Sequence, residues 1–143
     1  MKRLAIASLF AVTSIASISA VAFAKGGHIM DNGKTMTIDC KDSPAVMVMG
    51  NENTVTLTGT CTDVSVTGNK NTVTGAAASQ VSTTGNDNTV TIDTVDRITS
   101  TGNRNTIAYK KSAAGSDTKV SNTGKDNKIT KTNPPDSTIT PTK

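Results

Sequence analysis

The chain has 143 residues, a net charge of +4 and 34% apolar residues, with two Phe, one Tyr, no Trp and one His. It therefore lacks the large side chains that fill the thick cores of most enzymes. The length allows one domain, whose core must be thin and built from small side chains and backbone pairing.

The first 24 residues have the features of a secretory signal peptide. Lys2 and Arg3 precede an apolar run over residues 4–21, and Ala-Phe-Ala at residues 22–24 gives the small-x-small cleavage pattern. A membrane anchor is the alternative, but Ser and Thr dilute the run and no Cys follows it to accept a lipid. We expect cleavage after Ala24, no membrane span in the mature chain, and a periplasmic or extracellular location. Cleavage lowers the net charge to +2, so we expect no nucleic acid partner.

An internal repeat covers residues 31–131. Five copies of Gly-x-x-Asn are spaced 18, 17, 17 and 22 residues apart, and a degenerate copy at residues 34–38 precedes them. Repetition at a nearly constant period predicts coils that stack on one another. The predicted turn residues are Gly50 and Asn53, Gly68 and Asn71, Gly85 and Asn88, Gly102 and Asn105, and Gly124 and Asn127.

Apolar and polar residues alternate on both sides of each turn, as in Val64 and Val66 before Gly68 and Val73 after it. This period of two is typical of strands with one buried face. We predict an all-β domain over residues 25–131, a single small parallel β-solenoid of about six coils of 17–22 residues, each with two short strands. A set of antiparallel hairpins is the alternative, because the same turn chemistry serves both.

The turn residues themselves have a structural interpretation. Asn tolerates the left-handed conformation, and stacked Asn amides can bond to one another along a solenoid. The residue before each Asn changes sign from coil to coil, which favours the predicted register and makes this edge a poor metal or phosphate site. These residues are Glu52, Lys70, Asp87, Arg104 and Asp126.

Cys40 and Cys61 are the only cysteines, and in an exported protein such a pair usually forms a disulfide. A zinc site is the alternative, but His28, which we expect in a flexible end, is the only imidazole available. On the solenoid prediction the two cysteines occupy equivalent places in adjacent coils, within disulfide reach. The bridge would contribute roughly 3 kcal/mol.

The last coil is expected to cap the stack. The inward-facing residue two positions before each turn Gly becomes more polar from the first copy to the last. A polar last coil is what a repeat stack needs as its cap. The series is Val48, Val66, Thr83, Ser100 and Asn122. Residues 132–143 contain turn formers and no apolar period, so we predict a disordered tail.

The signal peptide, a Cys before the first full repeat, the run Leu-Thr-Gly-Thr-Cys at residues 57–61 and the reiterated Val-x-Val-x-Gly-x-x-Asn-Thr-Val resemble a secreted bacterial family, domain of unknown function 3060. The resemblance covers residues 38–109 well and the last coil weakly. It implies a small exported protein with a β-solenoid-like fold, and it implies no activity.

No catalytic site is predicted from the residues. Polysaccharide enzymes built on parallel β-solenoids need clustered carboxylates or a basic residue in a groove walled by long loops. Here the acidic residues are scattered over different coils, and the nearest pair, Asp93 and Asp96, is expected to be solvated. The scattered set is Asp31, Asp39, Asp42, Asp63, Asp93 and Asp96. We therefore predict a structural or binding protein that is not an enzyme and has no cofactor, no metal and an unknown partner.

Two surfaces are candidates for binding. The first is an outward face of Thr-x-Thr ranks, which resembles the flat face of β-solenoid ice-binding proteins, although Thr also suits any solvated strand. Its residues are Thr35 and Thr37, Thr54 and Thr56, Thr72 and Thr74, Thr89 and Thr91, then Thr106 with Ala108. The second is the long connection over residues 109–119, for which a solvated loop is the simpler interpretation.

The repeats are also similar to those of curli-type fibre subunits, whose copies stack end to end. The chain lacks the Gln ladder of that pattern and has the cysteine pair and the polar last coil. We expect a monomer, with self-assembly into a fibre as the alternative.

Overall fold

The computed structural model describes residues 22–23 and 27–132, and this part of the chain forms strands and no helix. It therefore holds no helix that could cross a membrane. The predicted signal peptide, apart from the backbone of residues 22–23, and the predicted tail after residue 132 lie outside the described residues. The strands are β1 (Ala22–Phe23), β2 (His28–Ile29), β3 (Thr35–Asp39), β4 (Ala45–Met49), β5 (Thr54–Asn69), β6 (Thr72–Asn86), β7 (Thr89–Asn103), β8 (Thr106–Lys111), β9 (Lys119–Thr123) and β10 (Lys128–Lys131).

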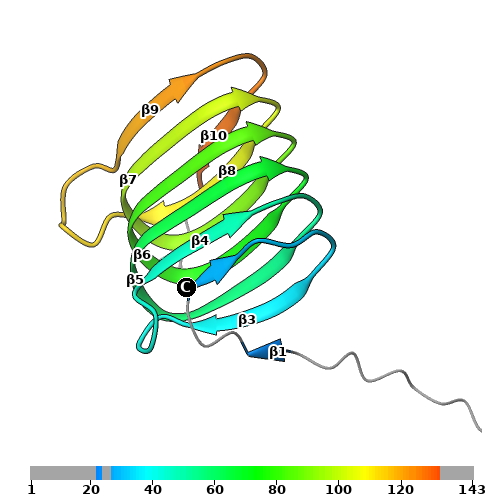
Figure 1. Ribbon diagram of the computed structural model, residues 1–143. Coiled ribbons are helices and arrows are strands. Elements are labelled where there is room, and N and C mark those ends of the chain that lie inside the picture. The colour runs from blue at the N-terminus through cyan, green and yellow to red at the C-terminus, as the bar shows by residue number, and fades with distance from the viewer. Residues whose placement is uncertain (1–21, 24–26, 133–143) are drawn as a thin grey trace, which may run out of the picture.

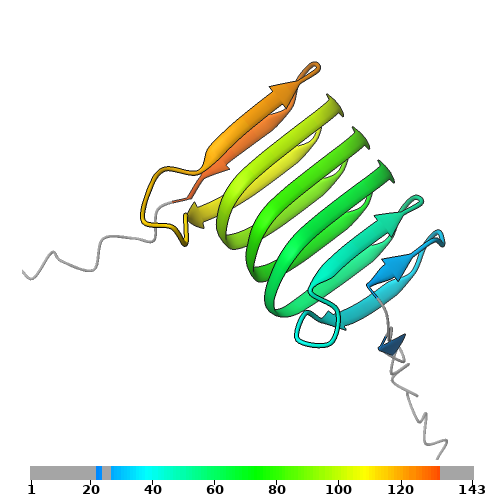
Figure 2. The same cartoon turned by 60° about the vertical axis from the view of Figure 1, so that its left-hand side comes forward.

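These strands wind into a parallel β-solenoid (Figures 1 and 2). One path of hydrogen-bonded neighbours runs β1-β3-β5-β6-β7-β8-β10, while β2 pairs with β4, β4 with β5, and β9 with β7. Every pairing is parallel. The solenoid prediction is therefore confirmed, and the antiparallel hairpin alternative is wrong.

The coils differ from the prediction in number and in how they turn. The strands before the turns form the row β2-β4-β5-β6-β7-β9, and the whole stack amounts to about five turns. The middle strands β5, β6 and β7 have 16, 15 and 15 residues. Each bends around a corner without losing its neighbours, apart from a register shift between Leu57 and Thr60 in β5. Two short strands per coil were predicted because polar residues interrupt the apolar alternation at this corner.

The interior is filled by columns of small side chains from successive coils. One column is Val55, Val73, Val90 and Ile107, all at most 1% exposed. Identical spacing of identical shapes is what stacking at about 4.8 Å requires. Thr83 and Ser100 face inward as predicted, both fully buried, and within the described chain neither hydroxyl has a hydrogen-bond partner.

The two ends of the stack are better ordered than the sequence suggested. His28 does not lie in a flexible end, because it belongs to β2 and pairs with Met47 of β4, with its side chain exposed. The backbone of Ala22 and Phe23 pairs with Met36 and Thr37 of β3. At the other end Thr132 still donates its backbone N–H to the carbonyl oxygen of Tyr109, so the ladder extends one residue beyond the predicted boundary.

Candidate functional site

The row of Gly-Asn-x-Asn turns forms one edge of the solenoid, and its backbone explains the motif. The glycines have φ between 115° and 126°, and a Cβ on Gly85 would collide with the carbonyl oxygen of Gly68 on the coil before. The left-handed conformation expected of the second Asn belongs instead to the charged residue before it, with φ of 54° to 59°. That expectation was wrong because the second Asn is needed elsewhere, inside the turn.

The second Asn of each turn is buried and forms an inner amide ladder. Asn53, Asn71, Asn88 and Asn105 are all 0% exposed. The Nδ2 of Asn71 donates to the Oδ1 of Asn88 at 3.1 Å and to the carbonyl oxygen of Gly50 at 2.8 Å. The backbone N–H of Asn71 also donates to the Oδ1 of Asn88. Each amide thus satisfies polar groups on the coils before and after it, which buried groups require.

The first Asn of each turn forms an outer ladder to which the sequence interpretation gave no role. The backbone N–H and the Nδ2 of Asn69 both donate to the Oδ1 of Asn51, at 3.0 Å each. Asn86 repeats this toward Asn69, and Asn103 toward Asn86. In the amide-to-amide bonds, the donors of the outer ladder point toward the N-terminal end of the stack, whereas those of the inner ladder point toward the C-terminal end. The outer ladder could have been predicted from the sequence, because Asn directly follows Gly in the first four clear copies.

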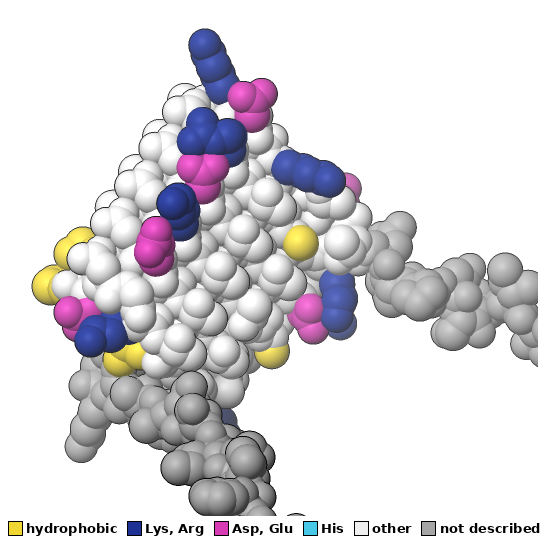
Figure 3. Space-filling view, turned by 90° about the vertical axis from the view of Figure 1, so that its right-hand side faces the viewer, with side chains coloured by type: hydrophobic (Ala, Val, Ile, Leu, Met, Phe, Trp, Pro, Cys, Tyr) yellow, Lys and Arg dark blue, Asp and Glu magenta, His cyan; other side chains and the backbone are white. Residues whose placement is uncertain are grey.

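Charged side chains follow this edge as a diagonal row of alternating sign (Figure 3). Lys70 lies 3.5 Å from Glu52, and Arg104 binds both carboxylate oxygens of Asp87 at 2.7 Å. The hydrogen bond from Arg104 lowers the pKa of Asp87, and the same contact raises that of Arg104. Because all four side chains are well exposed to solvent, the row fixes register and adds little stability.

The predicted Thr face is a regular array. Thr54, Thr72, Thr89 and Thr106 are register partners in one column, and a second column runs from Thr37 through Thr91 before it reaches Ala108. The array ends at Lys128 of β10, which follows Thr106 in the first column.

A second hydroxyl face, not predicted, covers the strands before the turns. Its columns are Ser65, Ser82, Thr99 and Ser121, and Thr67, Thr84, Thr101 and Thr123. The period-two pattern contained this face, because residues that alternate with buried Val64 and Val66 must point outward.

The cysteines lie on the side of the solenoid away from the turns. Cys40 and Cys61 form a disulfide with a Cα–Cα distance of 5.0 Å, and both are almost fully buried. The structure therefore confirms the predicted bridge. Cys61 lies inside the long strand β5, where it pairs with Ala78 of β6.

The long connection of the fourth coil lies on this same side. It comprises residues 112–118, between β8 and β9, and Asp96 holds it in place. The Oδ1 of Asp96 accepts hydrogen bonds from Ser112 Oγ at 2.6 Å and from the backbone N–H groups of Ala113 at 2.8 Å and Ala114 at 3.0 Å. The Ser112 and Ala114 hydrogen bonds lower the pKa of Asp96. Asp96 is partly exposed, and it also anchors this loop, a contact that was not predicted from the sequence.

Two recesses lie near this loop, and only the larger is lined by its residues. The larger, of about 460 Å³, lies between the loop and the corners of β5, β6 and β7, and the smaller, of about 140 Å³, lies between β7 and β9. Arg97 and Lys119 line both. A third recess, of about 510 Å³, includes Lys111 and the ion pair of Asp93 with Lys110 at 2.9 Å. Asp93, also expected to be solvated, is thus half-exposed and paired.

The structure does not bring the remaining candidate residues together. In residues 27–132 no three His, Cys, Asp or Glu side chains are placed to hold a metal ion. Asp31, Asp39 and Asp42 lie near the first coil, far along the stack from Asp93 and Asp96, as their strands show.

The family model described as protein of unknown function (DUF3060) matches residues 48–93 and, in a second overlapping match, residues 79–126. These matches span more than half of the chain. The protein belongs to this family. The two matches cover the coils with the most regular Gly-Asn-x-Asn turns, which supports the resemblance inferred from the motif. No curated protein and no solved structure gave a significant match.

Proposed function

We propose that this member of the DUF3060 family is an exported, non-enzymatic module that binds through the outer surface of a rigid β-solenoid. The observation that carries the proposal is the pair of faces with Ser and Thr hydroxyls in register from coil to coil. A filled interior and two amide ladders hold those hydroxyls at fixed spacing. Preorganised groups bind with a smaller entropic cost than mobile ones.

Export is supported by the signal-peptide features of the first 24 residues and by the disulfide, which is consistent with an oxidising compartment. The test is expression of the full chain with its own N-terminus, followed by fractionation and intact mass. We expect a chain that begins at Lys25 in the periplasm or medium, about 2 Da lighter than its reduced form. Two free thiols in a cytoplasmic chain would contradict export.

Ice binding is a second candidate, favoured by the two Thr columns in unbroken register over four coils. Micromolar protein should then shape growing ice crystals. Thr72→Lys should abolish the effect, since it places a charge in the middle of the array beside buried Val73. Thr84→Lys, the same change on the other hydroxyl face, is the control. Normal ice morphology with the wild type removes this candidate.

A monomer is supported over a curli-like fibre by the last coil. The Nδ2 of Asn127 donates to the Oδ1 of Asn122 in its own coil at 2.9 Å, in the place where earlier Asn residues bond to the next coil. The side-chain amide donor at this end of the inner ladder is therefore used within the last coil rather than offered to another copy. Sedimentation at tens of micromolar should show a monomer, and truncation after Tyr109 should promote assembly. Spontaneous thioflavin-positive fibres from the mature chain would make the fibre the primary function.

A further inference from the structure

Charge is unevenly distributed along the solenoid. Residues 97–132 contain eight Lys or Arg and two Asp, whereas residues 27–96 contain three Lys and eight Asp or Glu. The last two coils are therefore a basic end. Two of these cations are paired across the boundary between the two parts, Arg104 with Asp87 and Lys110 with Asp93. The cations that matter are those left without such a partner.

Arg97 and Lys119 depart from the alternation of positive and negative residues that is found along the turn edge. They are direct register partners in β7 and β9, so their backbones lie about 4.8 Å apart and two side chains of like charge are neighbours in the ladder. Like charges in directly opposed positions are unfavourable, and at the turn edge the signs alternate. Among the described residues neither side chain forms an ion pair. An anion placed between them would remove the repulsion.

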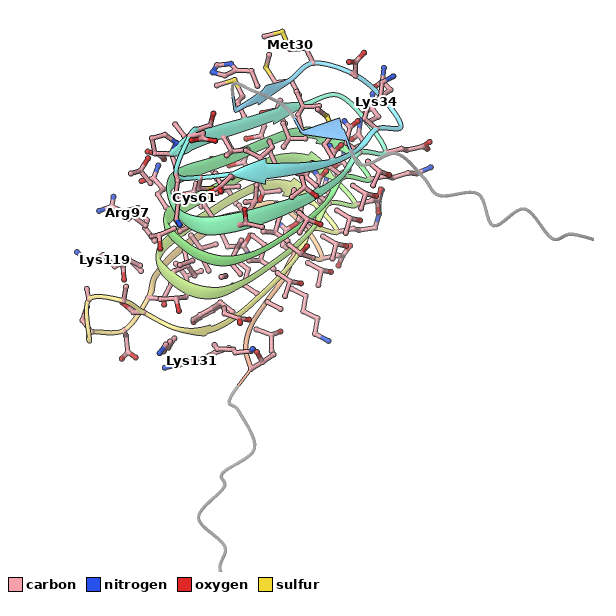
Figure 4. The ribbon with its side chains drawn as sticks, turned by 90° about the horizontal axis from the view of Figure 1, so that it is seen from below. Met30, Lys34, Cys61, Arg97, Lys119 and Lys131 are labelled. Atoms are coloured by element: carbon pink, nitrogen blue, oxygen red, sulfur yellow. A yellow bond between two sulfur atoms is a disulfide. The ribbon has the colours of Figure 1, made fainter. Side chains whose placement is uncertain are left out.

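The two cations stand at a preformed recess. They project on the same side of the molecule, next to the loop of residues 112–118 (Figure 4). The loop is fixed at its start by three hydrogen bonds to Asp96 and at its end by Thr118, whose hydroxyl donates to the carbonyl oxygen of Val95 at 2.7 Å. This wall exists because the fourth coil is longer than its neighbours, with 22 residues from Gly102 to Gly124.

The other lining groups restrict what the recess can accept. Thr62, Ser79, Gln80 and Ser116 offer hydroxyl and amide groups. Three carboxylates also line the recess, and among the described residues none of them forms an ion pair with Arg97 or Lys119. Asp96 is hydrogen-bonded to the loop, Asp117 lies 3.5 Å from Lys131, and Asp63 is two register positions from Arg97, roughly 9–10 Å along the stack. They disfavour a polyanion of high charge density and can accept hydrogen bonds from ligand hydroxyls.

We propose that Arg97 and Lys119 bind the carboxylate of an acidic sugar, with the sugar hydroxyls in the recess between β5–β7 and the loop of residues 112–118. Arg97 is suited to a bidentate carboxylate contact, and Lys119 supplies a second cation to the same group. This inference goes beyond the proposed function, because the recess lies apart from the two hydroxyl faces and adds a separate site with a stated ligand class.

The test is an NMR titration of disulfide-bonded, ¹⁵N-labelled mature protein with a trisaccharide of galacturonic acid at low salt. We expect saturable shifts of the amides of Ala113, Ala114 and Ser116. Arg97→Gln should weaken binding about tenfold or more, because it removes a charge-assisted hydrogen bond pair. Lys125→Gln is the matched control, since it removes one charge from the last coil at the turn edge, and it should change the affinity less than about twofold.

Three outcomes would overturn the proposal: no saturable binding, equal weakening by Arg97→Gln and Lys125→Gln, or equal binding of a neutral galactose trisaccharide. Inorganic sulfate is a further arm, and an affinity for sulfate equal to that for the trisaccharide would overturn the sugar part of the site. The trisaccharide is recovered and its mass measured. A shortened product would contradict the proposed non-enzymatic function and leave the site standing, while failure to bind leaves the exported module standing without this ligand.

Discussion

The two long edges of the solenoid are built on opposite principles. At the turn edge every coil repeats the same backbone conformation, with two Asn ladders and charges of alternating sign. At the opposite edge the coils differ from one another, apart from β6 and β7, which pass it in constant register. It carries the disulfide in the first coils, the register shift between Leu57 and Thr60, the loop of residues 112–118 in the fourth coil, and two stacked like charges.

The difference separates what stacking requires from what it merely tolerates. In the middle of the stack each buried amide bonds to the same amide of the next coil, so a departure from the turn pattern there would leave buried polar groups without partners. The far edge is held by pairing on either side and can carry insertions without disturbing the core. Features such as the loop and the Arg97–Lys119 pair can therefore be accommodated without disturbing the core, and they lie at the edge where the sequence repeat is least regular.

Glycine substitution at the two edges should give the largest contrast. Gly85→Ala places a Cβ against the carbonyl oxygen of Gly68 at φ of 121°, and neither backbone can move without breaking the ladder. We expect a loss of more than about 5 kcal/mol, or no folded protein. Gly115→Ala in the loop meets no atom within 4 Å and should cost only about 1 kcal/mol for its φ of 71°. Urea unfolding measures both, and equal losses would contradict the distinction between the edges.

The two Asn rows provide a comparison within the turn edge. Asn71→Ala removes the partner of the backbone N–H of Asn53 and of the carbonyl oxygen of Gly50, and it leaves the Nδ2 of Asn53 only its bond to the carbonyl oxygen of Asp31. We expect a loss of about 4 kcal/mol. Asn69→Ala removes the same number of amide groups from an exposed row, where water replaces them, and should cost less than about 1 kcal/mol. Similar denaturation midpoints for the two variants would refute the assignment of the inner row as the structural one.

The disulfide tests how much the irregular edge contributes to stability. Cys40→Ser with Cys61→Ser should lower the free energy of unfolding by about 3 kcal/mol, because the bridge closes a 21-residue loop in the unfolded chain. Since the bridge joins only the first coils, hydrogen exchange should accelerate in β3 and β4 far more than in β7. Uniform acceleration along the stack would show that the solenoid unfolds as one unit regardless of this staple.

Much of the turn edge could be predicted from the sequence, because stacking turns a spatial column into a sequence period. The glycines, the buried Asn row and the alternation of Glu52 and Lys70 all follow from a repeat of 17 or 18 residues. The cysteine pairing followed from the same period. The left-handed conformation was assigned to Asn because Asn adopts it more readily than most residues. That assignment was wrong because the Asn side chain is buried in the inner ladder, and the residue before it takes the positive φ instead.

The opposite edge could not be predicted, because its contacts have no period. Nothing in the sequence places Ser112 against Asp96, since their contact depends on how a loop without a counterpart in other coils folds back. Likewise the stacking of Arg97 on Lys119 depends on the length of the insertion, which shifts the register by five residues relative to a 17-residue coil. The candidate site thus lies where the repeat gave no information.

Asp96 should give the smallest and most local effect. Its pKa lies below the ordinary 3.8 because the loop donates to the carboxylate, so the loop contacts favour the charged form. The anchoring is therefore complete above about pH 4 and is lost as the pH falls through the lowered pKa.

We expect the amide shifts of Ala113 and Ala114 to move toward unstructured values in acid, while the amide of Asn88 in the inner ladder stays constant. Asp96→Ala, which removes the acceptor of all three hydrogen bonds, should show the released loop already at neutral pH and no acid transition, with unchanged core signals. A wild-type loop that remains in place at pH values well below 3.8 would mean that Thr118 and the ladder hold it without Asp96, and that the wall of the recess is built independently of this carboxylate.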